Sequence, residues 1–245
     1  MSFSWARVAA ILQKELRDYR RNRFVVVFTM SVLPLILVLG TTIQLFTIKG
    51  SISNTKLDNR IGISLLYMLV VPAVIPSILS AYSVVGEREQ GTLEPVLTTP
   101  MSPEEFLVGK ALAAFLPAVV LAYVIFGVFL GATALFADQV VSSAVFQRNH
   151  VLVQLLFTPL IAGWSIWVGI ALSTRLSDIR AAQQLAVFAS LPPLSIIALM
   201  SFNVLSPSVG LALGVGAALL LIDGLAWRVV AAMFNREYLV TSRRV

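Results

Sequence analysis

Long apolar runs recur along this chain, and they restrict its fold more than any other feature. Each run is about 20 residues or longer, the length that an α-helix needs to cross a hydrocarbon core of roughly 30 Å. Backbone N–H and C=O groups find no partner in lipid unless the segment is helical, so these runs predict membrane helices. The chain is 58% hydrophobic and only 12% charged, with a mean hydropathy of +0.89, which excludes an ordinary water-soluble domain of 245 residues.

We therefore predict an all-α polytopic membrane protein with six membrane-spanning helices. The chain, 1–245, is expected to form a single transmembrane domain, in which an arm (1–23) precedes the six-span bundle (24–232) and a tail (233–245) follows it. The six spans are expected at 24–47, 61–85, 107–137, 151–173, 182–201 and 208–232.

Lysine and arginine are distributed unevenly about these spans. Fourteen of the eighteen lie in the arm, after the second span, after the fourth span and at the C-terminal end, and four lie on the opposite side. Positive residues concentrate on the cytoplasmic side of membrane proteins. We therefore expect a multi-pass protein of the cell membrane, inner or plasma, with both termini in the cytoplasm. The net charge of +6 comes from residues that flank apolar spans, so its partner is the lipid bilayer rather than nucleic acid.

The arm has the pattern of a basic amphipathic helix. On a helical wheel its apolar side chains lie together and most of its charged ones face away, although Ile11 breaks the pattern. Such a helix beside a first span is expected to lie in the cytoplasmic headgroup layer. The alternative is a solvated helix whose charge only sets the orientation. The expected interface residues are Trp5, Val8, Leu12, Leu16 and Tyr19.

Residues 86–110 form a charged connection between the second and third spans. This segment holds five of the twelve acidic residues of the chain. Gly91 is expected to end the preceding helix in the left-handed conformation, and a short helix with an apolar stripe is expected at residues 92–99. Ser102 and Glu105 have the spacing of a capping box, which predicts the start of the next helix. Such a compact, structured connection suggests a docking surface for a partner.

The connection contains EREQGTLE at 87–94, VLTTP at 96–100, Glu105 and Gly109–Lys110. Together these residues resemble the signature of the ABC-2-type transporter permeases. In that family the segment forms a coupling helix that fits a groove in the cytosolic ATP-binding subunit. The resemblance implies that carboxylates here meet basic groups of that subunit while the apolar stripe fills the groove. The implied coupling residues are Glu87, Arg88, Glu89, Gly91, Thr92, Leu93, Glu94, Val96 and Leu97.

The resemblance also implies the rest of the assembly. Two ATP-binding subunits would pair with two permeases, either two copies of this chain or one copy and a related permease. The chain itself has no G-x-x-x-x-G-K-[ST] motif, since Ala111 follows Gly109–Lys110 and Glu104 stands where the first glycine is needed. ATP and Mg are therefore expected in the partner subunit, with no cofactor bound directly. Residue patterns for a catalytic site or a metal site are absent, so the chain is not expected to be an enzyme.

Four residues within the spans are candidates for a transport pathway. Pro72 and Pro76 should bend the second span, which also carries Tyr67. Asp223 is the one acidic residue well inside an apolar run, where a carboxylate costs about 2.5–3.5 kcal/mol at the centre of the bilayer. Arg228 is on a different side of the same helix. Asp223 is thus either a contact for substrate or for another helix, or a solvated interfacial residue.

The sequence departs from the family at the end of the fifth span. Exporters of the family often carry re-entrant helices between the fifth and sixth spans, and Ser201 to Pro207 leaves almost no room for them. Room exists only if Pro192–Pro193 breaks the fifth span early. The function implied is the membrane subunit of an ATP-driven exporter. The alternatives are a non-transporting scaffold that recruits a partner through 86–110 and, less favoured, a polytopic membrane enzyme.

Overall fold

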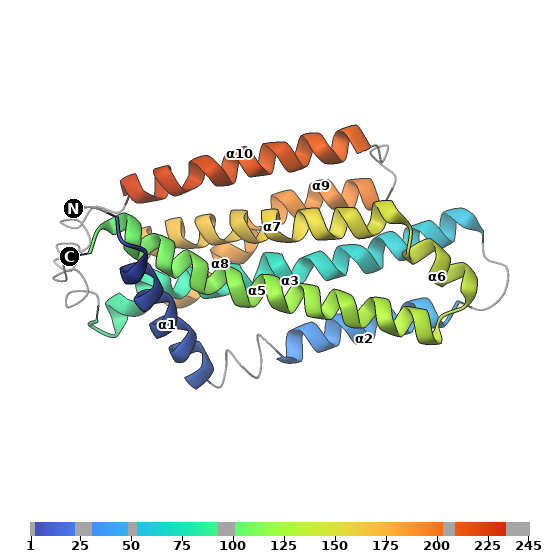
Figure 1. The fold of residues 1–245 in the computed structure, drawn as a ribbon, viewed down its shortest axis with the longest axis horizontal. Coiled ribbons are helices and arrows are strands. Elements are labelled where there is room, and N and C mark those ends of the chain that lie inside the picture. Colours follow the sequence, from blue (N-terminus) through green and yellow to red (C-terminus); the bar gives the residue numbers. More distant parts are fainter. Residues whose placement is uncertain (1–2, 23–30, 49–52, 93–100, 203–208, 234–245) are drawn as a thin grey trace.

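The structure is a computed structural model that describes residues 3–22, 31–48, 53–92, 101–202 and 209–233. Within these residues the fold is entirely helical, without strands. Figure 1 labels the helices, which run α1 (Trp5–Arg21), α2 (Leu33–Phe46), α3 (Asn54–Glu89), α5 (Pro103–Phe136), α6 (Gln139–Val145), α7 (Arg148–Arg175), α8 (Ile179–Ala189), α9 (Leu191–Ser201) and α10 (Val209–Met233).

The predicted membrane helices are largely confirmed. Within the described part of the chain, five helical segments are long and apolar enough to cross a membrane, namely α3, α5, α7, α8 with α9, and α10. Helix α2 is apolar but shorter, and residues 23–30 of the first predicted span lie outside the described part of the chain. The predicted coupling helix at 92–99 lies almost wholly outside it as well. The observed fold is therefore an all-helical bundle with five candidate spans and one shorter apolar helix.

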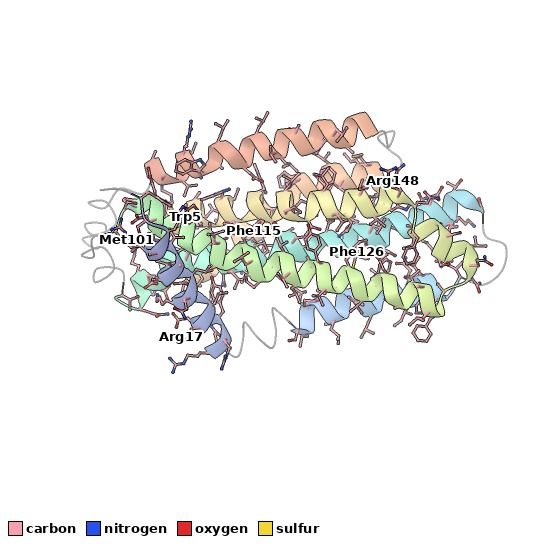
Figure 2. All side chains as sticks on the ribbon, viewed as in Figure 1. Trp5, Arg17, Met101, Phe115, Phe126 and Arg148 are labelled. Carbon is pink, nitrogen blue, oxygen red and sulfur yellow. The ribbon has the colours of Figure 1, made fainter. Side chains whose placement is uncertain are left out.

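Helix α3 occupies the centre of the bundle. It contacts α2, α5, α7, α8 and α9, and its most extensive contact is with α7. Helix α10 lies at the edge and packs mainly on α7, whereas α1 crosses one end of the bundle and packs on α5 (Figure 1). Figure 2 shows Trp5 and Met101 at that end and Arg148 at the opposite end. The long helices therefore join two well-separated ends of the molecule.

Close packing of α3 on α7 depends on small residues. A Cβ on Gly169 of α7 would stand 2.0 Å from Ser80 Oγ and 3.1 Å from the carbonyl oxygen of Ser77 on α3, so a larger residue there would displace the Ser80 side chain and crowd the α3 backbone. Nearby, Ser173 Oγ accepts hydrogen bonds from the backbone N–H groups of Val84 and Val85, at 2.9 and 3.0 Å. Serine and glycine at such contacts let membrane helices approach closely.

The predicted prolines of the second span lie inside α3, which remains helical through both. Pro72 and Pro76 are buried in the protein. A proline deprives a carbonyl one turn earlier of its hydrogen-bond partner. Burial at the centre of the bundle keeps such carbonyls away from lipid, where an unpaired group is costly.

The fifth span is interrupted, and one further helix was not predicted. Helix α8 ends at Ala189, Ser190 forms a turn, and α9 begins with Pro192 in its first turn. The chain then continues toward the end where α10 begins, so the described residues of α9 do not re-enter (Figure 1).

Helix α6, Gln139–Val145, lies in what the sequence suggested was only a connection between the third and fourth spans. Seven residues are too few for a periodicity argument to detect.

Candidate functional site

A buried charge cluster joins α1, α3 and α5 at the end of the bundle that α1 crosses. The ammonium group of Lys110 on α5 lies 2.7 Å from Glu15 Oε1 of α1 and 2.7 Å from Glu87 Oε1 of α3. All three residues are buried, with exposed fractions of 3%, 5% and 6% for Lys110, Glu15 and Glu87. Lys14 of α1, which is about half exposed, supplies a second ammonium to Glu87 and Glu15. Two cations thus balance two carboxylates, as buried charges require.

The electrostatics of α1 reflect this cluster. Burial lowers the pKa of Lys14, but the hydrogen bond to Glu87 and the negative charges of Glu15 and Glu87 together raise it above the usual value. Burial, followed by the charges of Glu15 and Asp18, raises the pKa of Tyr19. Lys14 therefore stays protonated and Tyr19 stays neutral throughout the physiological range.

Local sequence explains why Glu87 and Lys110 meet. Helix α3 ends just after Glu87 in a Schellman arrangement, in which the N–H of Thr92 donates to the Glu87 carbonyl at 2.9 Å and the N–H of Gly91 donates to the Arg88 carbonyl at 3.1 Å. Gly91 has φ of 70°, as predicted, a conformation that favours glycine. The Thr92 hydroxyl also donates to the carboxylate of Glu87. The cluster thus lies where α3 gives way to the charged connection.

A glycine brings α1 onto α5. A Cβ on Gly109 would stand 2.8 Å from the Cβ of Ile11, so a side chain at 109 would push α1 away. Gly109 is adjacent to Lys110, and this close approach places Glu15 within reach of the lysine. Ile11, the residue that broke the apolar pattern of the arm, is therefore a packing residue of the α1–α5 contact.

A second link ties the beginning of α1 to the beginning of α5. The predicted capping box is confirmed: Ser102 Oγ accepts from the Glu105 N–H at 3.2 Å, and the Ser102 N–H donates to Glu105 Oε2 at 3.0 Å. The other carboxylate oxygen, Glu105 Oε1, accepts from Arg7 Nη2 at 2.7 Å and from the Ser4 N–H at 2.6 Å. Glu105 is fully buried, so one carboxylate caps α5 and holds the start of α1.

The end of α3 also contacts the connection between α7 and α8. Arg88 Nη1 donates to the carbonyl of Leu176 at 3.3 Å, and Glu89 Oε1 accepts from the N–H of Ile179 at 3.3 Å. The last turn of α3 is therefore bound on one side to α1 and α5 and on the other side to the next connection at the same end. A displacement of this turn would therefore also displace α1, α5 and the connection between α7 and α8.

The structure brings together only some of the residues that the sequence suggested. Leu93, Glu94, Val96 and Leu97 lie outside the described residues. Glu87 was expected to face basic groups of a partner, but it is buried and its carboxylate is bonded to Lys14 and Lys110 of its own chain. In the structure this carboxylate already has two internal partners, and a contact of Glu87 with a partner subunit stays a prediction.

The apolar stripe of the arm divides between two environments. Val8 and Tyr19 are buried and Leu12 packs partly against the core, whereas Trp5 is 67% exposed and Leu16 is 38% exposed. At 100° per residue the protein-facing side of α1 is shifted toward Ile11 and Glu15, which leaves the other border of the stripe uncovered. The helical wheel gave no role to Glu15, and Lys110 entered only as part of the family resemblance, although a charged residue bordering an apolar stripe or inside a span is a signal for a buried partner.

The proposed pathway residues do not form one site. Tyr67 is 43% exposed on α3, while Pro72 and Pro76 are buried inside it. Asp223 lies between α10 and α7, where its Oδ1 is buried and has no hydrogen-bond partner. The described residues also contain no group of three or more His, Cys, Asp or Glu side chains that could hold a metal ion.

Comparison with known families agrees with the bundle and its charged end. The family model described as ABC-2 family transporter protein matches residues 9–235, nearly the whole chain. The chain belongs to the ABC-2 family of transporter proteins. No curated protein matches it. Permeases of the ABC-2 family are typically non-catalytic, multi-pass membrane subunits that pair with ATP-binding subunits. The resemblance that the sequence suggested is thus confirmed at the level of the family.

Proposed function

We propose that this ABC-2 protein is the permease of an ATP-driven exporter, and that residues 90–102 couple it to a separate ATP-binding subunit. Two copies of the chain, or one copy and a related permease, would pair with two such subunits. ATP and Mg would bind in those subunits. Both termini and the charge cluster would lie in the cytoplasm, as the distribution of lysine and arginine favours.

The observation that carries the coupling proposal is the position of Lys110. The connection leaves α3 just after Glu87 and enters α5 just before Glu105, and Lys110 pairs with Glu87 across the two helices. Burial makes this link strong, because separating the pair would leave an uncompensated charge inside the protein. A force on the connection would therefore move α3 and α5 together rather than spread them apart.

Helix α1 would follow the same movement. Glu15 attaches it to Lys110, and Arg7 and Ser4 attach it to Glu105. In this mechanism, closure of the ATP-binding subunits displaces the docked connection, and α1, α3 and α5 tilt as one unit. The contacts of Arg88 and Glu89 extend the displacement to the connection between α7 and α8.

A first experiment asks whether the apolar stripe of the connection holds an ATPase. The tagged chain is purified from membranes, and its co-purifying subunit is identified by mass spectrometry and by ATP hydrolysis. Replacing both Leu93 and Leu97 by Asp should abolish co-purification, because two carboxylates cannot enter an apolar groove unpaired. Replacing both by Met is the matched control, since it keeps the apolar character, and it should retain the subunit.

The outcomes separate the permease from the scaffold alternative. Undiminished recovery of the ATPase with the Asp variant, at equal membrane insertion, would refute docking through the connection. A co-purifying partner that does not hydrolyse ATP would instead favour the scaffold. Transport itself requires ATP-dependent movement of a solute across proteoliposomes that contain the complete complex.

A further inference from the structure

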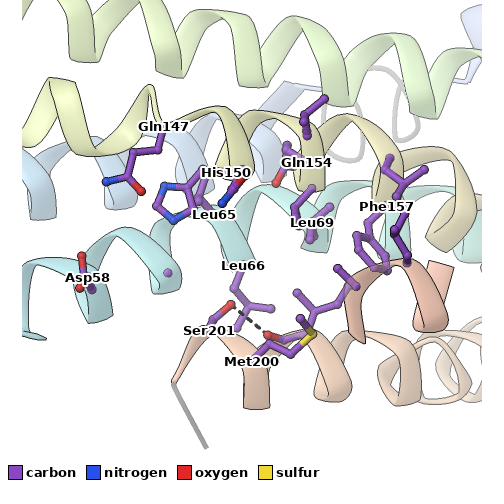
Figure 3. Close-up of a pocket in the computed structure, with 18 residues that line it drawn as sticks. Asp58, Leu65, Leu66, Leu69, Gln147, His150, Gln154, Phe157, Met200 and Ser201 are labelled. Carbon is purple, nitrogen blue, oxygen red and sulfur yellow. Dashed lines mark hydrogen bonds between the residues drawn. The ribbon is translucent and has the colours of Figure 1, made fainter. Parts of the chain in front are cut away.

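A second site lies at the opposite end of the bundle from the charge cluster. A partly open cavity of about 630 Å³ lies between α3, α7, α9 and α10 near the first turns of α3 and α7 (Figure 3). Its volume is within the roughly 300–1,000 Å³ that small-molecule sites occupy. Neither the family match nor the coupling proposal assigns a role to this region.

Most of the cavity wall is apolar. Leu66 and Leu69 of α3, Phe157 of α7, Met200 of α9 and Leu213 of α10 all line it. At one edge α3 and α9 are in close contact, because a Cβ on Gly62 would stand 2.8 Å from the carbonyl oxygen of Ser201. The wall is therefore suited to an apolar body of moderate size.

The polar lining contains a buried acceptor that has no donor. Gln154 of α7 is only 2% exposed, and its Oε1 has no hydrogen-bond partner. A buried polar atom without a partner is uncommon in folded proteins and calls for an explanation. Figure 3 shows the Gln154 side chain between His150 and Leu69, at the transition from the polar part of the lining to the apolar part.

His150 provides a second acceptor on the same face of α7. It precedes Gln154 by one helical turn, and its Nδ1 lies 3.0 Å from the carbonyl oxygen of Ala144. A carbonyl oxygen only accepts, so Nδ1 must carry the hydrogen, and in the neutral ring Nε2 is left as an acceptor. Asp58 of α3, which is exposed, lies beyond them at one end of the lining and contributes a negative charge (Figure 3).

The charged residues of the lining indicate which ligand charge the cavity favours. Among the residues that the structure describes, no lysine or arginine lines the cavity, and Asp58 is the one acidic residue that does. An anionic group could accept hydrogen bonds from the amides of Gln147 and Asn149, but it would meet the Asp58 carboxylate, which repels it. A cationic group with N–H donors would find the Asp58 carboxylate and two acceptors for its hydrogens.

We infer that this cavity binds an amphipathic primary amine in its ammonium form. The ammonium group donates hydrogen bonds to Gln154 Oε1 and His150 Nε2, Asp58 attracts its charge, and the apolar body packs against Phe157, Leu69 and Met200. This inference does not depend on the permease function, because it concerns binding alone. An amine of this class comes either from a soluble compound or from the headgroup of an aminophospholipid.

Phenylbutylamine is a suitable probe, because three analogues separate the contributions of the charge, its sign and the N–H donors to binding. Phenylbutanol lacks the charge, the N-trimethyl derivative keeps the charge without N–H donors, and phenylbutyrate reverses the charge. Binding to the full chain in phosphatidylcholine nanodiscs is measured by saturation-transfer NMR. We expect the amine to bind most tightly and the carboxylate least tightly.

Variants at the lining residues test the assignment of the acceptors. Gln154→Leu keeps the volume but removes the acceptor, and it should weaken the amine roughly tenfold or more, as for a hydrogen bond to a charged group. Gln154→Glu should tighten the amine, and Asp58→Asn should weaken it. Asp138→Asn is the matched control, because Asp138 is exposed, lies in the connection after α5 and does not line the cavity; it should leave binding unchanged.

Three results would overturn the inference. They are equal binding of phenylbutyrate and phenylbutylamine, unchanged amine affinity in a folded Gln154→Leu variant, and tighter amine binding in Gln154→Leu than in Gln154→Glu. Adding phosphatidylethanolamine to the nanodiscs then identifies the source. Competition with the probe shows that a lipid headgroup is the ligand, and absence of competition shows that it is a soluble amine.

Discussion

The carboxylate of Asp223 on α10 lies directly against Gly163 on α7. A Cβ on Gly163 would stand 2.5 Å from Asp223 Oδ2 and 3.0 Å from its Cγ. Helix α10 exposes most of its surface and packs mainly on α7, so this contact is one of the few that position it. The sequence suggested that Asp223 faces either another helix or water, and the structure places it at the α7–α10 contact.

Gly163→Ala should therefore loosen the attachment of α10. We expect the unfolding free energy to fall by about 1 kcal/mol. This value is at the lower end of the usual range for overpacking, because a carboxylate side chain can turn away more easily than a backbone group can move. Gly216→Ala on α10 is the control, since its new Cβ would make only an ordinary contact, 3.5 Å from Leu156, and it should be neutral or slightly stabilising. Adding Asp223→Ala to Gly163→Ala should recover the loss in fluorescence-detected thermal unfolding. No recovery would show that the carboxylate is not the obstacle.

Substitutions of Asp223 test whether its carboxylate takes part in transport. An acidic residue whose oxygen is buried without a partner costs free energy, and such residues in membrane helices usually have a function. We expect Asp223→Asn and Asp223→Leu to assemble with the ATP-binding subunit and to lose transport in proteoliposomes. If Asn transports normally and only Leu lowers the Tm, the side chain makes a structural hydrogen bond. Normal transport and normal melting of both would leave Asp223 without either role.

Lys110→Met should be among the most destabilising single changes in the protein. It leaves Glu15 and Glu87 with only the half-exposed ammonium of Lys14, and the loss of one partner of a buried ion pair typically costs about 3–5 kcal/mol. Lys14→Met is the matched control, because the half-exposed Lys14 should contribute only about 0–1 kcal/mol. Glu87→Gln in the Lys110→Met background should restore part of the loss, since it removes one of the two charges. A Tm for Lys110→Met equal to that of Lys14→Met would contradict the buried cluster.

Features that depend on local chemistry were predictable from the sequence. The length of the apolar runs located α3, α5, α7 and α10, because the thickness of a bilayer sets a minimum length. The left-handed glycine at Gly91 and the capping box of Ser102 and Glu105 were predictable for the same reason, since each is decided by a few adjacent residues. These signals located the charged connection without any knowledge of the partner helices.

The long-range contacts were not predictable. Glu15, Glu87 and Lys110 come from three helices far apart in the sequence, and only the packing of α1 on α5 brings them together. The helical wheel of the arm was informative about which residues are apolar but not about which of them face protein. The interruption at Ser190, by contrast, directly precedes Pro192–Pro193, which is a local signal, whereas helix α6 is too short for periodicity to detect.

The uncovered border of α1 leads to a prediction about the membrane surface. Trp5 and Leu16 are apolar and exposed, whereas Arg17 is exposed and charged (Trp5 and Arg17 are labelled in Figure 2). If α1 lies in the headgroup layer, spin labels at Trp5 and Leu16 should be relaxed by oxygen dissolved in lipid, and a label at Arg17 by a water-soluble nickel complex. Val8 and Tyr19 are unsuitable positions, because labels there would disrupt the packing on α5. Equal accessibility of all three labels to the nickel complex would show that α1 is a solvated helix whose charge only sets the orientation.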